Sequence, residues 1–531
     1  MDDKLREEIN RRRTFAIISH PDAGKTTLTE KFLLFGGAIN TAGSVKGKAN
    51  SKYAVSDWMD IEKERGISVT SSVLQFNYDG YCINILDTPG HQDFSEDTYR
   101  TLMAADSAVM VIDASKGVEA QTIKLFKVCV MRHIPIFTFI NKMDRDARDT
   151  FELLDDIETV LGIKTCPVNW PIGSGKEFKG VYDRKTKIVS TFQAISTGGA
   201  KKAEETDYHM DDEALKELVG PYLFDQFNEE IELIDGATEE MDIEKVRAGE
   251  LSPVFFGSAL NTFGIEQFLN YFLKMTTPPI GRNSSEGIID PVTEPFSAFV
   301  FKIQANMNKA HRDRIAFMRI CSGKFEAGME VYHAASKRKI KLSQPQQLMA
   351  QDRKIVDEAY AGDVIGVFDP DLFSIGDTLT TGGKKFEYEG IPTFAPEHFC
   401  RVVQLNSMKR KQFVKGVTQI AQEGAIQIFQ EYTAGLSEII VGVVGVLQFD
   451  VLKYRLENEY GCEIRLEPIP YNYIRWVKDP TIDVTKLKRV SDVKKVKDMK
   501  GNPLLLFANE WVIDQVLQHN EGLELEEFRK N

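Results

Sequence analysis

Four short polar segments could together bind a nucleotide, and the first is a candidate phosphate loop. Residues 19–26 read Ser-His-Pro-Asp-Ala-Gly-Lys-Thr, after an apolar run at 14–18 and before a helical pattern. Such a loop needs inward-pointing main-chain N–H groups at a helix N-terminus, a lysine at the terminal phosphates and a hydroxyl for Mg²⁺. Gly24, Lys25 and Thr26 supply these in order, although Ser19 stands where glycine is usual. We predict phosphate contacts from Ser19, His20, Pro21, Asp22, Ala23, Gly24, Lys25, Thr26 and Thr27.

The second segment, Asp87-Thr88-Pro89-Gly90, follows an apolar run at 82–86. Its carboxylate can hold Mg²⁺ through a water molecule, and the N–H of Gly90 can bind a γ-phosphate. We therefore predict that residues 87–90 contact the nucleotide. Thr26 directly, and Asp87 through water, are the predicted metal ligands in these two segments.

The third and fourth segments could read a purine base. Asp144 can accept two hydrogen bonds from guanine N1–H and its exocyclic amine, which adenine cannot offer in that arrangement. Asn141 can bond the purine edge, and the stem of Lys142 can cover the ring. A main-chain N–H of residues 258–260 can reach the guanine oxygen. The predicted base contacts are Asn141, Lys142, Met143, Asp144, Ser258, Ala259 and Leu260, and the predicted ligands are GTP or GDP with Mg²⁺.

Each of these segments follows an expected strand. Taken singly, Asp87 or Asp144 is better interpreted as an ordinary turn carboxylate, and the phosphate loop alone could be a chance match. Their order favours one site, because open α/β sheets bind ligands at the carboxyl ends of their strands. Apolar runs alternating with helical patterns predict an α/β fold with a doubly wound sheet. The expected strands cover residues 14–18, 82–86, 107–112, 135–140 and 254–256.

Two clusters of helix- and strand-breaking residues divide the chain, at 277–285 and at 390–396. They predict a nucleotide-binding domain at 1–282, with an acidic helical insertion at about 203–250. Short strands separated by turns predict a β-barrel domain at 290–388. A smaller α+β domain is expected at 392–531, with helical periodicity at 408–429 and 445–460 around a strand at 438–443.

Composition bears on the cellular compartment of the protein and on the partners that it could bind. Its 531 residues carry a net charge of −13, but residues 203–250 hold 17 acidic and 3 basic residues, so the remainder sums to about +1. An RNA-facing surface is therefore not excluded. The charged N-terminus and the lack of a long apolar stretch favour a cytoplasmic protein without membrane contact. Six singly spaced cysteines agree with a reducing compartment.

Two segments resemble the switches of the translational GTPases: Arg65-Gly66-Ile67-Ser68, and Asp87-Thr88-Pro89-Gly90 with His91. The resemblance implies that His91 is catalytic and orients the attacking water, where small GTPases use a glutamine. It also implies that Ser68, where most members have threonine, is a Mg²⁺ ligand.

Within that family the chain is similar to the class II release factors of bacteria, at residues 14–27, 56–59, 93–100, 301–307 and 444–451. The resemblance implies a monomeric, ribosome-stimulated GTPase of translation termination. Its partners would be the ribosome and the class I peptide chain release factors, whose departure it would promote after peptide release.

Two alternatives remain at this point. One is a translocase-like or ribosome-rescue GTPase similar to elongation factor G, whose third domain residues 421–427 and 445–450 resemble. Against it, the sequence leaves no room for the two further domains of that factor. The other is a GTP-stabilised binding scaffold without turnover, against which His91 and the switch segments argue.

Overall fold

A seven-stranded sheet forms the centre of the first domain, and all its strands except the edge strand β2 run parallel. The strand order is β2-β3-β1-β4-β5-β11-β6. The bounds in this computed structural model are β1 (Arg12–Ser19), β2 (Ser72–Tyr78), β3 (Tyr81–Asp87), β4 (Ser107–Asp113), β5 (Ile136–Asn141), β6 (Lys164–Pro167) and β11 (Leu251–Phe256). The structure describes residues 3–39, 62, 68–193, 204–305, 314–342, 345–349, 352–383, 385–391, 393–432, 439–488 and 491–527.

Helices cover both faces of this sheet, which explains why its strands are apolar throughout. In β1, Phe15 and Ile17 pack in one layer with α2 and α10, while Ala16 and Ile18 pack in the other with α4, α5 and α6. The doubly wound α/β fold predicted from the sequence is confirmed, and each of the five expected strands is present. The helices are α2 (Lys25–Phe35), α4 (Ser95–Leu102), α5 (Ala120–Met131), α6 (Thr150–Leu161) and α10 (Ile265–Met275).

The sequence predicted a helical insertion at about 203–250, but the structure contains a strand there as well as helices. Its helices α7 (Glu213–Val219), α8 (Pro221–Ala237) and α9 (Ile243–Ala248) follow a four-stranded antiparallel sheet with the order β10-β9-β8-β7. The strands are β7 (Asn169–Ile172), β8 (Gly180–Asp183), β9 (Ile188–Gln193) and β10 (Glu204–His209). Strand β10 was missed because it is an exposed edge strand, half of whose residues are acidic, without an apolar face to reveal its period.

The second domain is a β structure, as predicted. Its main sheet has the order β18-β17-β23-β14-β15-β22-β19-β20, beside the pair β16-β21. A hairpin begins in the predicted domain break with β12 (Arg282–Ser284) and continues beyond it with β13 (Gly287–Ile289). The remaining bounds are β14 (Ser297–Ala305), β15 (Arg314–Ser322), β16 (Lys324–Glu326), β17 (Glu330–His333), β18 (Arg338–Lys341), β19 (Gln346–Met349), β20 (Asp352–Ile355), β21 (Glu358–Tyr360), β22 (Val364–Phe368) and β23 (Thr378–Thr380).

The third domain contains one sheet with the order β27-β24-β26-β25-β29-β30-β28-β31. Its first half is a split β-α-β unit, in which α11 and α12 pack on the same face of four strands. The elements are β24 (His398–Gln404), α11 (Arg410–Gln422), β25 (Gln427–Glu431), β26 (Ile439–Val443), α12 (Leu447–Asn458), β27 (Ile464–Pro468), β28 (Tyr473–Val477), β29 (Val493–Lys497), β30 (Pro503–Phe507), α13 (Glu510–His519) and β31 (Leu525–Glu526).

One helix of this domain is shorter than predicted. Helical periodicity suggested a helix over 408–429, but α11 ends at Gln422 and residues 427–431 form β25. Gly424 has a φ of +76°, a left-handed conformation that commonly ends a helix at glycine. The predicted helix at 445–460 and strand at 438–443 correspond to α12 and β26.

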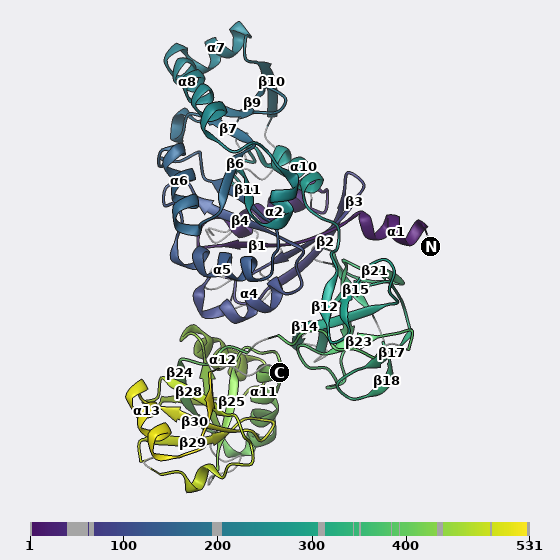
Figure 1. Ribbon diagram of the computed structural model, residues 1–531, viewed down its shortest axis with the longest axis vertical. Coiled ribbons are helices and arrows are strands. Elements are labelled where there is room, and N and C mark those ends of the chain that lie inside the picture. The colour runs from purple at the N-terminus through teal and green to yellow at the C-terminus, as the bar shows by residue number, and fades with distance from the viewer. Residues whose placement is uncertain are drawn as a thin grey trace.

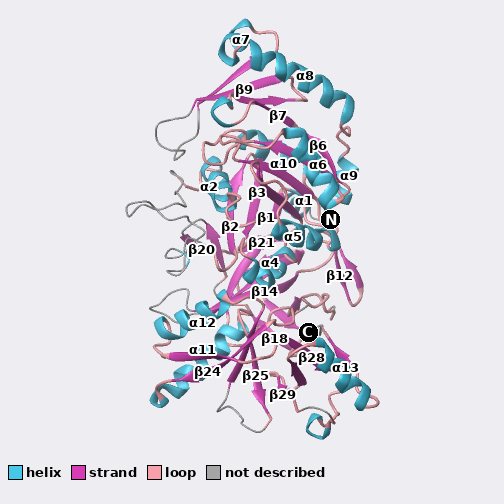
Figure 2. Ribbon diagram, turned by 90° about the vertical axis from the view of Figure 1, so that its left-hand side faces the viewer, coloured by secondary structure: helices cyan, strands magenta, loops and turns pink. Residues whose placement is uncertain are grey.

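The second and third domains lie along the lower edge of the first domain (Figure 1). The insertion with α7 and α8 lies at one end of the molecule, and the third domain lies at the other (Figure 2). The short N-terminal helix α1 (Asp3–Asn10) packs beside β21 of the barrel. Among the described helices, none has the length and apolar character needed to cross a bilayer.

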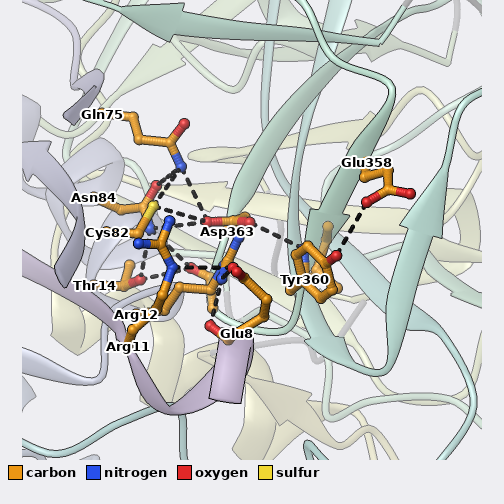
Figure 3. A network of polar contacts seen from close by, with 12 residues as sticks. Glu8, Arg11, Arg12, Thr14, Gln75, Cys82, Asn84, Glu358, Tyr360 and Asp363 are labelled. Atoms are coloured by element: carbon orange, nitrogen blue, oxygen red, sulfur yellow. Dashed lines mark hydrogen bonds and ion pairs between the residues drawn. The ribbon is translucent and has the colours of Figure 1, made fainter. Parts of the chain in front are cut away.

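A buried polar network joins the first domain to the barrel (Figure 3). Its centre is Asp363, whose Oδ2 accepts from Arg12 Nε at 2.7 Å and whose Oδ1 accepts from Gln75 at 3.0 Å and Asn84 at 3.3 Å. Thr14 donates to the carbonyl of the neighbouring Gly362 at 2.5 Å. Burial acts to lower the pKa of Arg12, but the charge of Asp363 raises it above its usual range. The network therefore favours the charged form of the buried Arg12 guanidinium.

Candidate nucleotide site

The loop after β1 has the backbone of a phosphate-binding turn. Ser19 ends the strand, and Gly24 precedes α2 with a φ of +99°. A Cβ at Gly24 would lie 2.2 Å from the side-chain nitrogen of Asn141, so this position requires glycine for its conformation and for space. Lys25 and Thr26 then begin the helix, which places main-chain N–H groups at its N-terminus, where phosphate groups bind favourably.

Lys25 and Asp87 come together at the ends of β1 and β3. Their ammonium and carboxylate groups form an ion pair, and both side chains are buried. Within the described part of the chain, the second carboxylate oxygen of Asp87 is buried and has no hydrogen-bond partner. The neighbouring Thr88 hydroxyl donates to the carbonyl of Ile17 at 2.7 Å, which holds this segment against β1. A buried, unsatisfied carboxylate oxygen beside a phosphate loop fits the water-mediated Mg²⁺ ligand predicted for Asp87.

Asn141 connects the first and last of the four segments. Its Nδ2 donates to the carbonyl of Ala23 at 2.8 Å, and its Oδ1 accepts from the N–H of Ala259 at 2.8 Å. Both ends of its amide therefore help to hold two loops together. Because the amide has a second donor and a second lone pair, the contact of Asn141 with the purine edge stays a prediction.

Lys142 crosses from β5 to the phosphate loop. Its Nζ donates to the carbonyl of Asp22 at 2.5 Å and to Asp113 at 2.6 Å, and its φ is +71°. Burial acts to raise the pKa of Asp113, but hydrogen bonds from Lys142 and Ser115 lower it. Asp113 therefore holds the Lys142 stem in place. Sequence reasoning missed Asp113, although its position at the end of β4 was a usable signal.

Asp144 follows β5 and has an available carboxylate oxygen. The main chain before it is held by a bond from Met143 N–H to the carbonyl of Gly257 at 3.1 Å. Oδ1 of Asp144 is buried and has no hydrogen-bond partner among the residues that the structure describes. Ser258 exchanges main-chain hydrogen bonds with Phe263 at 3.0 Å, which closes the neighbouring loop over residues 258–263. Ala259 is buried and Leu260 is exposed at the loop surface.

The remaining residues of the phosphate loop make local contacts with neighbouring segments or are exposed. A Cβ at Gly90 would lie 3.4 Å from the Cα of Pro21, so the second segment packs closely against the first. His20 Nε2 lies 3.4 Å from a carboxylate oxygen of Glu119. Asp22 is exposed with a φ of +64°, and Thr27 is half-buried in the first turn of α2.

His91 lies at the start of the short helix η1 (Gln92–Phe94) and is one-third exposed, at 33%. Its Nδ1 accepts the main-chain N–H of Asp93 at 3.3 Å. A carboxylate oxygen of Asp93 lies 3.3 Å from the same nitrogen. The ring meets Phe94 edge-on, with centroids 6.2 Å apart. With Nδ1 turned towards η1, the ring can offer Nε2 to a water molecule.

Most of the other predicted switch lies outside the described residues. This applies to Arg65, Gly66 and Ile67. Residues 56–59, which carry part of the resemblance to the class II release factors, also lie outside the described residues. Ser68 is described and half-buried. The next two residues, Val69 and Thr70, donate main-chain N–H groups to Glu62 at 2.9 and 3.1 Å.

Family models match the chain in three consecutive parts. Residues 10–278 match the elongation factor Tu GTP binding domain, residues 295–382 match elongation factor G domain 2, and residues 388–517 match the C-terminal domain of class II release factor RF3. The chain is 57% identical over 521 residues to peptide chain release factor 3 of Symbiobacterium thermophilum, covering 98% of each chain. The chain belongs to the peptide chain release factor 3 family.

Members of this family from cyanobacteria are similarly close. Release factor 3 of Gloeothece citriformis is 52% identical over 98% of this chain and 96% of its own, and that of Synechococcus elongatus is 53% identical over 98% and 94%. The chain is therefore a translational GTPase of translation termination that interacts with the ribosome. A crystal structure of a Thermus thermophilus protein shares the fold, with a TM-score of 0.69 at 22% identity over 88% of this chain and 69% of that one.

Proposed function

We propose that this release factor 3 protein uses GTP hydrolysis to promote dissociation of class I peptide chain release factors from the ribosome after peptide release. The observation that carries the proposal is the 57% identity to a release factor 3 over 98% of the chain, which includes all three domains. We further propose that the chain acts as a monomer, which sedimentation at a mass of 60.0 kDa would support.

The nucleotide site supports specific roles for its residues. Lys25 binds the terminal phosphates, and main-chain N–H groups at the start of α2 hold the phosphate oxygens. Asp144 accepts hydrogen bonds from the guanine edge, and its buried, unpartnered Oδ1 is the oxygen in place to do so. Lys142, held by Asp113, lies across the floor of the base site.

The metal is proposed to bind among Thr26, Ser68 and Asp87, the last through a water molecule. When bound, Mg²⁺ neutralises charge on the phosphate oxygens as the terminal phosphoryl group is transferred. The unsatisfied carboxylate oxygen of Asp87 is the feature of this structure that fits such a group. Release of Lys25 from Asp87 frees the ammonium group to bind phosphate.

His91 is proposed to orient the attacking water. A histidine held through Nδ1 can place Nε2 beside the water with little loss of side-chain entropy. Its position in the segment that joins β3 to α4 also connects this step to the third domain. Hydrolysis removes the terminal phosphate that both switches contact, and the switches then relax.

The decisive experiment uses ribosomes stalled at a stop codon after peptide release, carrying a labelled class I release factor. The protein with GTP should accelerate departure of the label. The same preparation should fail to move a pre-translocation complex by one codon. Translocation without accelerated factor departure would favour the elongation factor G-like alternative and overturn the proposal.

A further inference from the structure

The carboxylate of Asp93 connects His91 to the third domain. One oxygen, Oδ1, lies 3.3 Å from His91 Nδ1. The other, Oδ2, accepts the main-chain N–H of Leu447 at 2.7 Å. Leu447 is the first residue of α12, and Asp93 is buried with 6% of its surface exposed. A single buried side chain therefore contacts both the proposed catalytic residue and another domain.

Asp93 supplies α12 with the N-terminal cap that its own sequence lacks. The residue before the helix is Val446, whose side chain cannot accept a hydrogen bond, and α12 has no side-chain cap of its own. A carboxylate at this position satisfies a free N–H and interacts favourably with the helix dipole. The orientation of the Asp93 carboxylate is thus set by the docked third domain.

Close approach at this contact requires glycine on the third-domain side. A Cβ at Gly445 would lie 2.2 Å from the Cγ of Asp93. Around it, Phe94 of η1 packs with Val69 and Val451 in a small apolar cluster. The contact is therefore shaped closely around Asp93 and is not a loose encounter of two surfaces.

The two contacts of His91 Nδ1 favour different imidazole tautomers. When Nδ1 accepts the Asp93 N–H, the proton of a neutral ring resides on Nε2. When Nδ1–H donates to the Asp93 carboxylate, Nε2 keeps its lone pair and can accept a hydrogen bond from water. A buried carboxylate selects the second state in the same way that the aspartate of a Ser-His-Asp triad orients its histidine.

We propose that Asp93 is a positioning residue for His91, and that docking of α12 holds its carboxylate in the orientation that favours water activation. The inference rests on the proposed role of His91. It makes GTP hydrolysis sensitive to the position of the third domain, because withdrawal of the Leu447 N–H leaves the carboxylate free to turn away from the ring.

The test is single-turnover GTP hydrolysis on saturating ribosomes by Asp93→Asn, His91→Ala and the double variant. Asparagine keeps the size of the side chain and the main-chain N–H but not the charge, so Asp93→Asn should slow hydrolysis by roughly 10-fold. In the His91→Ala background the same change should slow it by less than about twofold, because residues that act through one another are not additive. GTP affinity and the half-saturating ribosome concentration should stay unchanged.

Arg100→Lys is the matched control. Arg100 also crosses to the third domain, donating to the carbonyl of Gly424 at 3.1 Å, but it does not contact His91. Lysine retains a positive charge beside Glu96. Arg100→Lys should therefore slow GTP hydrolysis by the same factor with and without the His91→Ala change. Asp93 acts only in docking if Asp93→Asn slows hydrolysis as much in the His91→Ala background as in the unmodified protein. The same holds if Asp93→Asn changes only the half-saturating ribosome concentration. Either result would overturn this inference but not the proposed role of His91. An undiminished rate in His91→Ala would overturn the role of His91 and the inference together.

Discussion

The first domain meets its two neighbours through contacts of different character. At the barrel, Arg12, Asn84 and Gln75 converge on the buried carboxylate of Asp363, and each donor contributes a hydrogen bond (Figure 3). At the third domain, Asp93 and Arg100 reach main-chain groups instead. A cavity of about 40 Å³, sufficient for water, lies beside this second contact and is lined by Phe94, Lys302 and Val451 among others.

The two contacts also differ in their place along the sheet. Arg12 begins β1, whereas Ser19 ends it at the phosphate loop, so the barrel contact lies about 23 Å from that loop along the strand. Asp93 lies two residues from His91. The buried network around Asp363 is therefore distant from the phosphate loop, while the contact of Asp93 adjoins the second switch segment. A change in that segment would reach the third domain through fewer residues than it would reach the Asp363 network.

The largest expected effect comes from breaking the barrel contact. Asp363→Ala removes the more deeply buried of two carboxylates that contact Arg12, because Glu8 remains at 2.7 Å, and it also takes the acceptor from Gln75 and Asn84. The free energy of unfolding should fall by about 3–5 kcal/mol. The urea-induced unfolding of the barrel, followed by a probe in that domain, measures the change. Glu358→Gln, which removes an exposed ion pair with Lys324, should change it far less. Equal effects of the two variants would contradict the proposed importance of the network.

Cysteine labelling provides a second measurement of the same contact. Burial, and then the nearby charge of Asp363, raise the pKa of the Cys82 thiol to about 12, so it is protonated and unreactive near neutral pH. Asp363→Ala should raise its alkylation rate. Cys129, whose pKa burial also raises to about 12, lies on the buried face of α5 and should label at an unchanged rate.

His91→Ala tests the functional side of the comparison. It should leave GTP affinity and the barrel contact intact, but slow ribosome-stimulated hydrolysis by roughly 10²-fold or more. Quenched-flow measurement of one turnover gives the rate. His209→Ala, at an exposed histidine of the insertion, is the control and should hydrolyse GTP at the normal rate. A normal rate in His91→Ala would remove His91 from the catalytic role.

Asp144→Asn should change recognition of the base and leave the contacts with both neighbouring domains intact. Loss of the carboxylate should weaken GTP binding by roughly 10- to 100-fold, the range for a hydrogen bond to a charged group. Binding of xanthosine triphosphate should improve, because xanthine presents a carbonyl where guanine has its amine. Competition with a fluorescent nucleotide measures both, with the exposed Glu152→Gln as control. An unchanged preference for GTP would exclude Asp144 as the base reader.

The smallest effect is expected from Gly445→Ala at the third-domain contact. The added methyl group would meet the Asp93 side chain, and relief of that contact should cost about 1–3 kcal/mol of domain docking. Because the third domain can withdraw slightly, we expect hydrolysis on ribosomes to slow by about 10-fold or less, with unchanged GTP affinity. Gly236→Ala, at an exposed glycine of α8 with open space around it, tests for a general effect of glycine replacement. An unaltered rate in Gly445→Ala would mean that the contact tolerates a shift.

The sequence alone determined the elements whose signals are local. The ends of β1, β3, β5 and β11 could be predicted because apolar runs stop where polar motifs begin, and an open sheet brings those ends to one edge. The site residues Lys25 and Asp87 are neighbours for that reason. Local signals failed at β10, whose acidic composition hides an edge strand, and at β25, where the helical pattern continues past Gly424.

Only the tertiary structure decided which side chains meet across domains. Arg12 and Asp363 are 351 positions apart, and Asp93 and Leu447 are 354 apart. No period in a sequence encodes such pairs, because their meeting depends on how whole domains dock. The same holds for Asn141: its motif predicted contact with the base, and only the structure showed that its amide also bonds the main chain of Ala23 and Ala259 and so joins two loops. Residue type sets which chemistry is possible, and the fold sets which partner each group finds.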